Sequence, residues 1–140
     1  MAWRAAKSLL TLRKQLDAKA PKRKTGLDGT IGDEAHQSKA SDHNPWVKDG
    51  AVGVVTALDV THDPAGGCDA NALAEAIRAS RDPRVKYIIW NRRIANFRAI
   101  GSADAWQWRK YTGENPHTEH IHISVRSMKD KYDSEKAWAV

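Results

Sequence analysis

Alternation of apolar and polar residues is clearest near the end of the chain, in the run NPHTEHIHISV. Ile121, Ile123 and Val125 occupy every second position there, and this period of two predicts a half-buried β-strand. His120 and His122 then lie on one face of that strand, opposite the isoleucines. The polar face of this strand is therefore either a solvated edge or a place where two imidazoles meet one ligand.

Helical periodicity marks the start of the chain. Leu9, Leu12 and Leu16 follow helical spacing, with basic residues between them, and predict an amphipathic helix over about residues 2–19 that packs on the domain. The basic residues scattered through this run distinguish it from a secretory signal peptide. Synthesis in a cytoplasm without a signal peptide is the resulting expectation.

Runs of β-branched and apolar residues predict the rest of the sheet. We expect a central strand over residues 54–62 (VVTALDVTH), a second over 85–90 (VKYIIW) and a third over 94–100 (IANFRAI). Another helix follows Asp69, which suits an N-cap, and ends before Pro83. The 140 residues are thus expected to form one α+β domain, with a small, mainly antiparallel sheet and two or three packed helices.

Composition narrows the classes of partner. The net charge of +6 suits nucleic acid, an anionic membrane or the acidic polymers of a bacterial cell wall. No apolar run approaches the roughly 18 residues that a membrane span needs. The single cysteine, Cys68, cannot form an internal disulfide, which fits synthesis in a reducing cytoplasm.

Two polar features interrupt the apolar pattern. A long segment rich in Gly, Asp, Ser and Lys follows the first helix and ends in Ser41-Asp42-His43, and loops of such length are usually functional or disordered. Asp59 lies inside the otherwise apolar strand. A carboxylate in that position is costly unless a cation or several donors satisfy it. A buried salt bridge and a metal site are the two interpretations of Asp59.

Nitrogen and oxygen ligands are therefore available from separate parts of the chain. His43, Asp59 and the two strand histidines offer the ligand types that suit Zn²⁺ with an open position for water. Glu119 would stand beside that water. A regular strand would point Glu119 and His122 to opposite faces, since they differ by an odd number. We therefore expect Glu119 to lie at an irregular strand start after Pro116, with its carboxylate turned toward the metal.

The motifs SDH, ALD and EHIH, in this order, resemble those of the zinc D-alanyl-D-alanine carboxypeptidases and endolysin peptidases, the LAS-type metallopeptidases. The longer strings DGTIGDEAHQSKASDHNP, DPRVKYIIWNRRI and NPHTEHIHISV are similar to a phage-encoded branch of that family. The resemblance covers about residues 20–126, which would form the catalytic core. It implies a metallopeptidase domain spanning residues 1–140.

The resemblance also implies roles for individual residues. His43, Asp59 and His122 match the three ligands of one zinc ion per chain. Glu119 matches the catalytic base, and His117 or His120 would be the next base to test. His120 matches a histidine that helps to stabilise the transition state. On this basis only His122 of the strand pair is a ligand, whereas the spacing alone permits both.

Substrate contacts are implied for two further residues. Arg23 matches the arginine that holds a substrate carboxylate, a task suited to its planar guanidinium. Ser41 matches the serine of the first motif. One departure from the family pattern is the longer stretch NPWVKDGAVGVVTAL between His43 and Asp59. An inserted loop explains it if the ends of the loop return to one place. Otherwise the other candidate ligands are Asp42, His36 and His62.

The expected function is that of a zinc-dependent, monomeric peptidoglycan peptidase, like a phage endolysin or a virion-associated enzyme. The bond that it cuts stays open between D-Ala-D-Ala, L-Ala-D-Glu and a cross-bridge. A basic nucleic-acid-binding module, favoured by the charge and the KRK run, is the main alternative, but it leaves Asp59 unexplained. A phosphoesterase built on histidine pairs, suggested by HIHIS, is another. Three tryptophans could line a glycan groove, but we expect them to be buried in the core: Trp90, Trp106 and Trp108.

Overall fold

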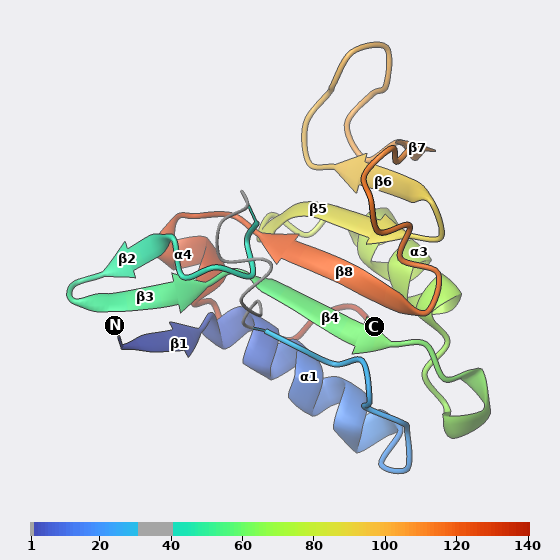
Figure 1. Cartoon of the computed structure of the whole chain (residues 1–140), viewed down its shortest axis with the longest axis horizontal. Helices are drawn as coiled ribbons and strands as arrows, with labels where there is room; N and C mark the ends of the chain where they lie inside the picture. The colour runs from blue at the N-terminus through green and yellow to red at the C-terminus, as the bar shows by residue number, and fades with distance from the viewer. Residues whose placement is uncertain (1, 31–40) are drawn as a thin grey trace.

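The computed structural model describes residues 2–30 and 41–140, and Figure 1 shows the arrangement of their elements. The described elements, in chain order, are β1 (Trp3–Ala5), α1 (Lys7–Lys19), β2 (Val47–Asp49), β3 (Val52–Val55), β4 (Ala57–Thr61), a 3-10 turn (Pro64–Gly66), α3 (Ala70–Ser80), β5 (Val85–Trp90), β6 (Arg93–Asn96), β7 (Arg109–Lys110), β8 (His120–Val125) and α4 (Lys129–Tyr132).

These strands form two sheets. The smaller sheet has the order β1-β3-β2, and the larger has the order β4-β8-β5-β6-β7. All of the strand pairs are antiparallel except β1 with β3, which is parallel. With three α-helices among the described residues, this architecture confirms the expected α+β fold with a mainly antiparallel sheet.

The core lies on one face of the larger sheet. The predicted apolar face of α1 is buried there, and Leu9 and Leu12 are fully inaccessible. They share the core with Ile121 and Ile123 of β8, which are also fully buried, and with the inward face of α3. Each such side chain contributes roughly 1.5–3 kcal/mol through burial. The opposite, polar face of β8 is therefore the face on which a functional site can form.

Some element predictions need correction. The single strand expected over residues 54–62 is divided between β3 and β4, which belong to different sheets. Residues 3–5 form β1 instead of the start of the helix, because they pair in parallel with residues 53–55 of β3. Strand β4 lies at the edge of the larger sheet and not at its centre. Its outer side is partly covered by a bridge in which Gly29 and Asp59 exchange backbone hydrogen bonds. The N-cap prediction is confirmed, since the Asp69 side chain accepts from the Asn71 N–H at 2.8 Å.

The stretch that lengthens the chain between His43 and Asp59 is a β-hairpin. Strands β2 and β3 pair from Val47↔Val54 to Asp49↔Val52, and Gly50 supplies the positive φ of +62° at the turn. The chain therefore runs outward along one strand of the hairpin and returns along the other. Its ends return to one place, as the insertion hypothesis requires.

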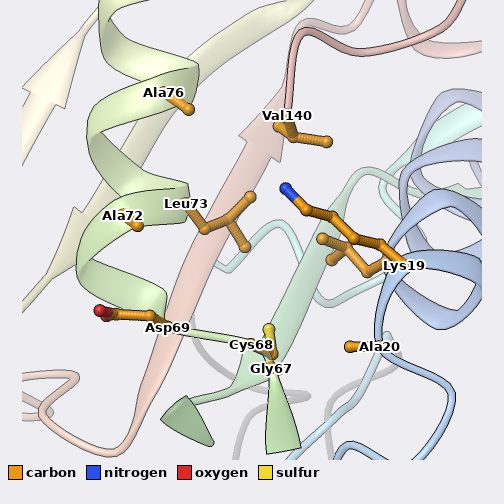
Figure 2. A pocket seen from close by; sticks show the side chains of 10 residues that line it. Lys19, Ala20, Gly67, Cys68, Asp69, Ala72, Leu73, Ala76 and Val140 are labelled. Carbon is orange, nitrogen blue, oxygen red and sulfur yellow. The ribbon is translucent and has the colours of Figure 1, made fainter.

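The predicted core tryptophans and the single cysteine lie in or beside the core. Trp90 and Trp106 are buried, as expected, and Trp108 packs against the core with partial burial. Cys68 is a buried free thiol beside an apolar cavity of about 260 Å³ between α1 and α3, where Leu73 and Val140 also contribute (Figure 2). Burial raises the pKa of this thiol, so it stays protonated. Of the described helices, none is long and apolar enough to cross a membrane.

Candidate metal centre

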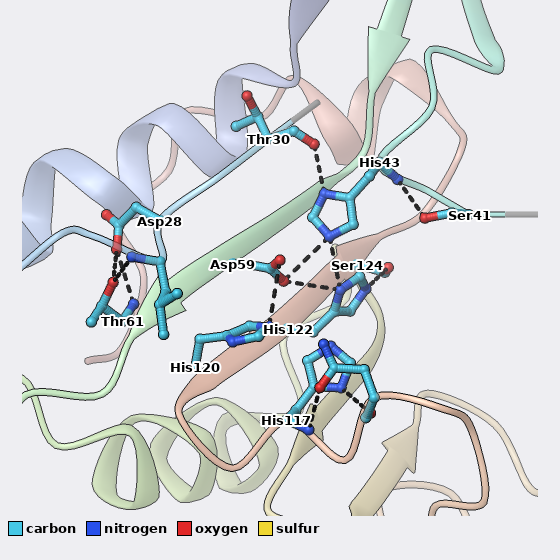
Figure 3. Close-up of polar contacts among 12 residues, drawn as sticks. Asp28, Thr30, Ser41, His43, Asp59, Thr61, His117, His120, His122 and Ser124 are labelled. Carbon is cyan, nitrogen blue, oxygen red and sulfur yellow. Dashed lines mark hydrogen bonds and ion pairs between the residues drawn. The ribbon is translucent and has the colours of Figure 1, made fainter. Parts of the chain in front are cut away.

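Strand register brings Asp59 and His122 together. The two residues face each other across the β4–β8 ladder, and each points away from the core, since its sequence neighbours are buried. His43 arrives from the loop that precedes the hairpin (Figure 3). The three residues that the sequence analysis named as ligands thus meet on the polar face of the larger sheet.

The ligand atoms of these residues form an almost equilateral triangle. His43 Nε2 lies 3.1 Å from His122 Nδ1, and each of these nitrogens lies 3.2 Å from Asp59 Oδ1. Two ligands of a tetrahedral zinc ion, each bound at about 2.0–2.1 Å, are about 3.3 Å apart. The spacing therefore fits three ligands of one small metal ion.

The outer nitrogens of both histidines are held by the protein. His43 Nδ1 donates to the Thr30 carbonyl at 2.6 Å, which leaves the lone pair of the neutral ring on Nε2. His122 Nε2 lies 2.8 Å from Ser124 Oγ, which is fully buried. Such outer partners fix the ring orientation and the tautomer of metal-binding histidines. The inner nitrogens, His43 Nε2 and His122 Nδ1, are thereby held beside Asp59 Oδ1.

The electrostatics of the triangle favour a cation. Burial opposes ionisation of Asp59, but hydrogen bonds from His122 and His43 outweigh it and hold the pKa of the carboxyl below its usual range. Burial lowers the pKa of His122, and Asp59 offsets this only in part. Burial also lowers the pKa of His43, but the bond to Asp59, the charge of that carboxylate and the bond to the Thr30 carbonyl together raise it above its usual range. A carboxylate and two nitrogen lone pairs in this geometry form a site that could bind a metal ion.

A second group of potential ligands shares the same carboxylate. Asp59, His117 and His120 have their ligand atoms within 4.8 Å of one another. His120 Nε2 lies 3.7 Å from Asp59 Oδ2, which is longer than any side of the first triangle. The rings of His117 and His120 pack edge to face at 4.9 Å between centroids. The first group has the tighter convergence and is therefore the better candidate for a metal site.

A cavity of about 240 Å³ opens beside the triangle. Its wall includes Tyr87, whose ring stacks on His122 at 5.4 Å with an interplanar angle of 9°. Burial and the nearby Asp42 carboxylate raise the pKa of Tyr87 to about 12, so its phenol stays protonated. The described residues that line the cavity are Ser41, His43, Asp59, Tyr87, Ile89, Tyr111, Glu114, Asn115, His117 and His122.

His117 is the functional candidate that the motif comparison did not select. It is buried, with a positive φ of +55° that is uncommon outside glycine. Its Nδ1 donates to the Asn115 carbonyl at 2.8 Å, so the other ring nitrogen carries the lone pair. Burial, together with the charges of His122 and His120, lowers its pKa to about 4. A neutral imidazole whose second ring nitrogen carries a lone pair therefore lines the cavity.

Glu119 is not brought to the cavity. Its side chain is exposed, and it is absent from the described lining residues. The expected irregular approach to the strand is present, because β8 begins only at His120, Thr118 and Glu119 form bends, and His117 has a positive φ. A 2.9 Å bond from the His62 N–H to the Glu119 carbonyl holds this bend beside the end of β4. The bend nevertheless leaves the Glu119 side chain exposed and outside the cavity lining. Ser41, in contrast, lines the cavity, and its Oγ accepts from the His43 N–H at 3.2 Å.

Arg23 is also engaged elsewhere. Its guanidinium is 1% exposed and donates two hydrogen bonds to Asp28, at 3.1 and 2.7 Å, and one to Asp17 at 2.9 Å. Asp28 in turn accepts from both the N–H and the hydroxyl of Thr61 (Figure 3). This arginine is therefore not available to a substrate carboxylate. It fixes the loop that carries Thr30 against β4.

We expect Arg23→Ala to lower the free energy of unfolding by about 3–5 kcal/mol, because it leaves the Asp28 carboxylate buried without its partner. Urea denaturation measures the change. Arg13→Ala is the matched control, since Arg13 reaches the same carboxylate from an exposed position at 3.8 Å, and its loss should cost less than about 1 kcal/mol. Unaltered stability in Arg23→Ala, combined with a raised KM, would return the residue to substrate binding.

Two of the other candidate ligands, His62 and Asp42, have interaction partners outside the triangle. His62 Nδ1 accepts from the Ala70 N–H at 3.0 Å, at the start of α3, and its ring packs on Trp90. Asp42 pairs with Lys86 at 3.0 Å. Neither residue belongs to the triangle. His36 lies outside the described residues.

No known protein family, curated protein or solved structure matches this chain. The function is therefore argued from the geometry of the site and from the motifs that the sequence contains.

Proposed function

We propose that this protein is a zinc peptidase that hydrolyses a peptide bond in the stem peptide or cross-link of bacterial peptidoglycan. The observation that carries the proposal is the triangle of His43 Nε2, Asp59 Oδ1 and His122 Nδ1 at the edge of an open cavity. Two imidazoles and one carboxylate, with room for water and substrate, are typical of catalytic zinc sites. The resemblance of the SDH, ALD and EHIH motifs to LAS-type peptidases supports the same substrate class.

The metal would be held by His43, Asp59 and His122, one ion per chain. Mixed nitrogen and oxygen ligands without thiolate suit zinc in a hydrolytic role. When bound, zinc would supply Lewis acidity, which lowers the pKa of water toward about 7 and polarises a carbonyl. Thr30 and Ser124 would keep the two rings in the required orientation.

The proton transfers fall to His117 in this proposal. Its Nδ1 is committed to the Asn115 carbonyl, so Nε2 would accept the proton of the attacking water and return it to the leaving nitrogen. The lowered pKa keeps this ring neutral at neutral pH; it makes Nε2 a weak base toward the water and, once protonated, a strong proton donor to the leaving nitrogen. His120 would donate a hydrogen bond to the negative charge that develops on the carbonyl oxygen. Ser41 and Tyr87 would contact the substrate in the cavity.

Digestion of purified peptidoglycan tests the proposal. Zinc-loaded protein should release new amino and carboxyl ends, which mass spectrometry of the fragments would identify, and a chelator should stop the release until zinc is restored. Metal analysis of protein without a histidine tag should find about one zinc per chain. Absence of any new ends with zinc-loaded, folded protein would reject the peptidase function. Fragments shortened in the glycan would indicate a different hydrolase.

A further inference from the structure

A shallow groove continues from the cavity along the protein surface. Its described lining consists of Ser41, Asp42, Trp46, Lys86 and Tyr87. Ser41 and Tyr87 also line the metal cavity, so the two hollows share a wall. A ligand that fills the groove would therefore extend directly into the space beside the metal ligands.

Trp46 stands at this groove with its ring open to solvent. The residue is 58% exposed, the highest value among the exposed large apolar residues of the described chain. Its indole N–H donates to the Ser41 carbonyl at 2.6 Å, and its backbone N–H donates to the Asn44 carbonyl at 2.8 Å. Because the polar atoms of the ring are satisfied internally, only the apolar face remains for a ligand. The ring is also held in place before any ligand arrives.

The polar groups of the groove are balanced in charge. Lys86 Nζ donates to both carboxylate oxygens of Asp42, at 3.2 and 3.0 Å, and the lysine side chain is 44% exposed. The ammonium retains a third N–H, and the carboxylate retains lone pairs. Donor and acceptor thus lie side by side with no net charge. The stem peptide of peptidoglycan carries carboxylates, for which a neutralised lysine is a poor partner.

A sugar ring matches these features. One face of a pyranose presents C–H groups, whose partial positive charge is attracted by the negative face of an aromatic ring. Its rim carries hydroxyl and acetamido groups, each able to pair with a donor or an acceptor. We propose that the groove at Trp46 binds an amino sugar of the glycan strand, so that the substrate is a stem peptide still attached to its sugar. This inference rests on the proposed peptidase function and places cleavage in the part of the peptide near the glycan.

Two substrates with the same peptide sequence test this proposal, one with its amino sugar and one without. Full-length, zinc-loaded wild-type protein should prefer the sugar-bearing substrate in kcat/KM. In Trp46→Ala that preference should fall at least about tenfold, because one aromatic face is lost. Trp3→Ala is the matched control, since Trp3 is 42% exposed but belongs to β1 and does not line the groove. That variant should keep the wild-type preference.

An equal loss on both substrates in Trp46→Ala, or an unaltered preference, would overturn the sugar subsite. A wild-type protein that cuts neither substrate would instead reject the peptidase function, and binding of an N-acetylglucosamine tetramer, measured by calorimetry, then decides on the groove. Binding that is lost in Trp46→Ala and kept in Trp3→Ala would support the subsite without catalysis. Absence of binding to the wild-type chain would reject it.

Discussion

Replacement of His122 by alanine is expected to abolish metal binding. The imidazole supplies one of three atoms that lie 3.1–3.2 Å apart, and it is almost completely buried, so no solvent-exposed group can take its place. Loss of an outer partner of a metal ligand typically weakens metal affinity by about 10- to 100-fold, and loss of the ligand itself should exceed that range. Competition with a chromophoric chelator measures the affinity. His43→Ala should give the same result, and hydrolysis should be lost with the metal in both variants.

His120→Ala is the matched control for this experiment. His120 occupies the same face of β8, and its Nε2 lies 3.7 Å from Asp59, so it differs from His122 mainly in its distance from the triangle. We expect this variant to retain zinc. Circular dichroism of each variant separates loss of the ligand from loss of the fold.

Other outcomes would redraw the site. Zinc retained in His122→Ala but lost in both His117→Ala and His120→Ala would move the ion to the second ligand group. The wild-type protein could instead bind two equivalents of zinc, with one equivalent lost when a ligand of either group is replaced. That result would make Asp59, which belongs to both groups, a bridging ligand. One equivalent that depends on His43, Asp59 and His122 is the result that the geometry supports.

Local patterning predicted the strand faces well, because alternation along a strand is a property of the chain itself. Burial then fixes which face of β4 and of β8 points inward. A slip by one residue would turn Ile121 and Ile123 toward solvent and bring the histidines into the core. The apolar pattern thus predicts that Asp59 and His122 lie on polar faces, whereas their direct pairing depends on the β4–β8 register. The return of His43 depended on the β2–β3 hairpin, for which Asp49-Gly50 was the local signal.

The remaining site residues depend on tertiary contacts that the sequence does not display. An arginine suits both a substrate carboxylate and a buried salt bridge, and only the position of Asp28 inside the fold separates the two for Arg23. The positive φ of His117 is stabilised by the backbone N–H groups of Asn91 and Arg92, which bond to the carbonyls of His117 and Pro116 at 2.8 Å. These bonds come from the β5–β6 turn, far away in the sequence. The motif comparison instead selected Glu119, which lies in the bend before β8 with its side chain exposed.

His117→Gln tests the assignment of the proton transfers. Glutamine retains a polar side chain of similar reach but cannot accept a proton at neutral pH. General acid–base assistance contributes typically about 10²- to 10⁴-fold, so peptidoglycan hydrolysis should fall by at least about 100-fold. Zinc content should stay near the wild-type value, because His117 lies outside the tighter ligand triangle. Rate measurements on zinc-loaded protein, with metal analysis of the same samples, check both expectations.

Glu119→Gln distinguishes the two candidate bases directly. The substitution is nearly isosteric and removes the carboxylate that the motif resemblance assigns as the base. Since Glu119 is exposed and does not line the cavity, we expect its loss to alter the rate less than about threefold, far below the effect of a missing base. A severe loss in Glu119→Gln beside a fully active His117→Gln would reverse the assignment. It would also imply that the bend before β8 rearranges when substrate binds, because the exposed Glu119 carboxylate does not line the cavity.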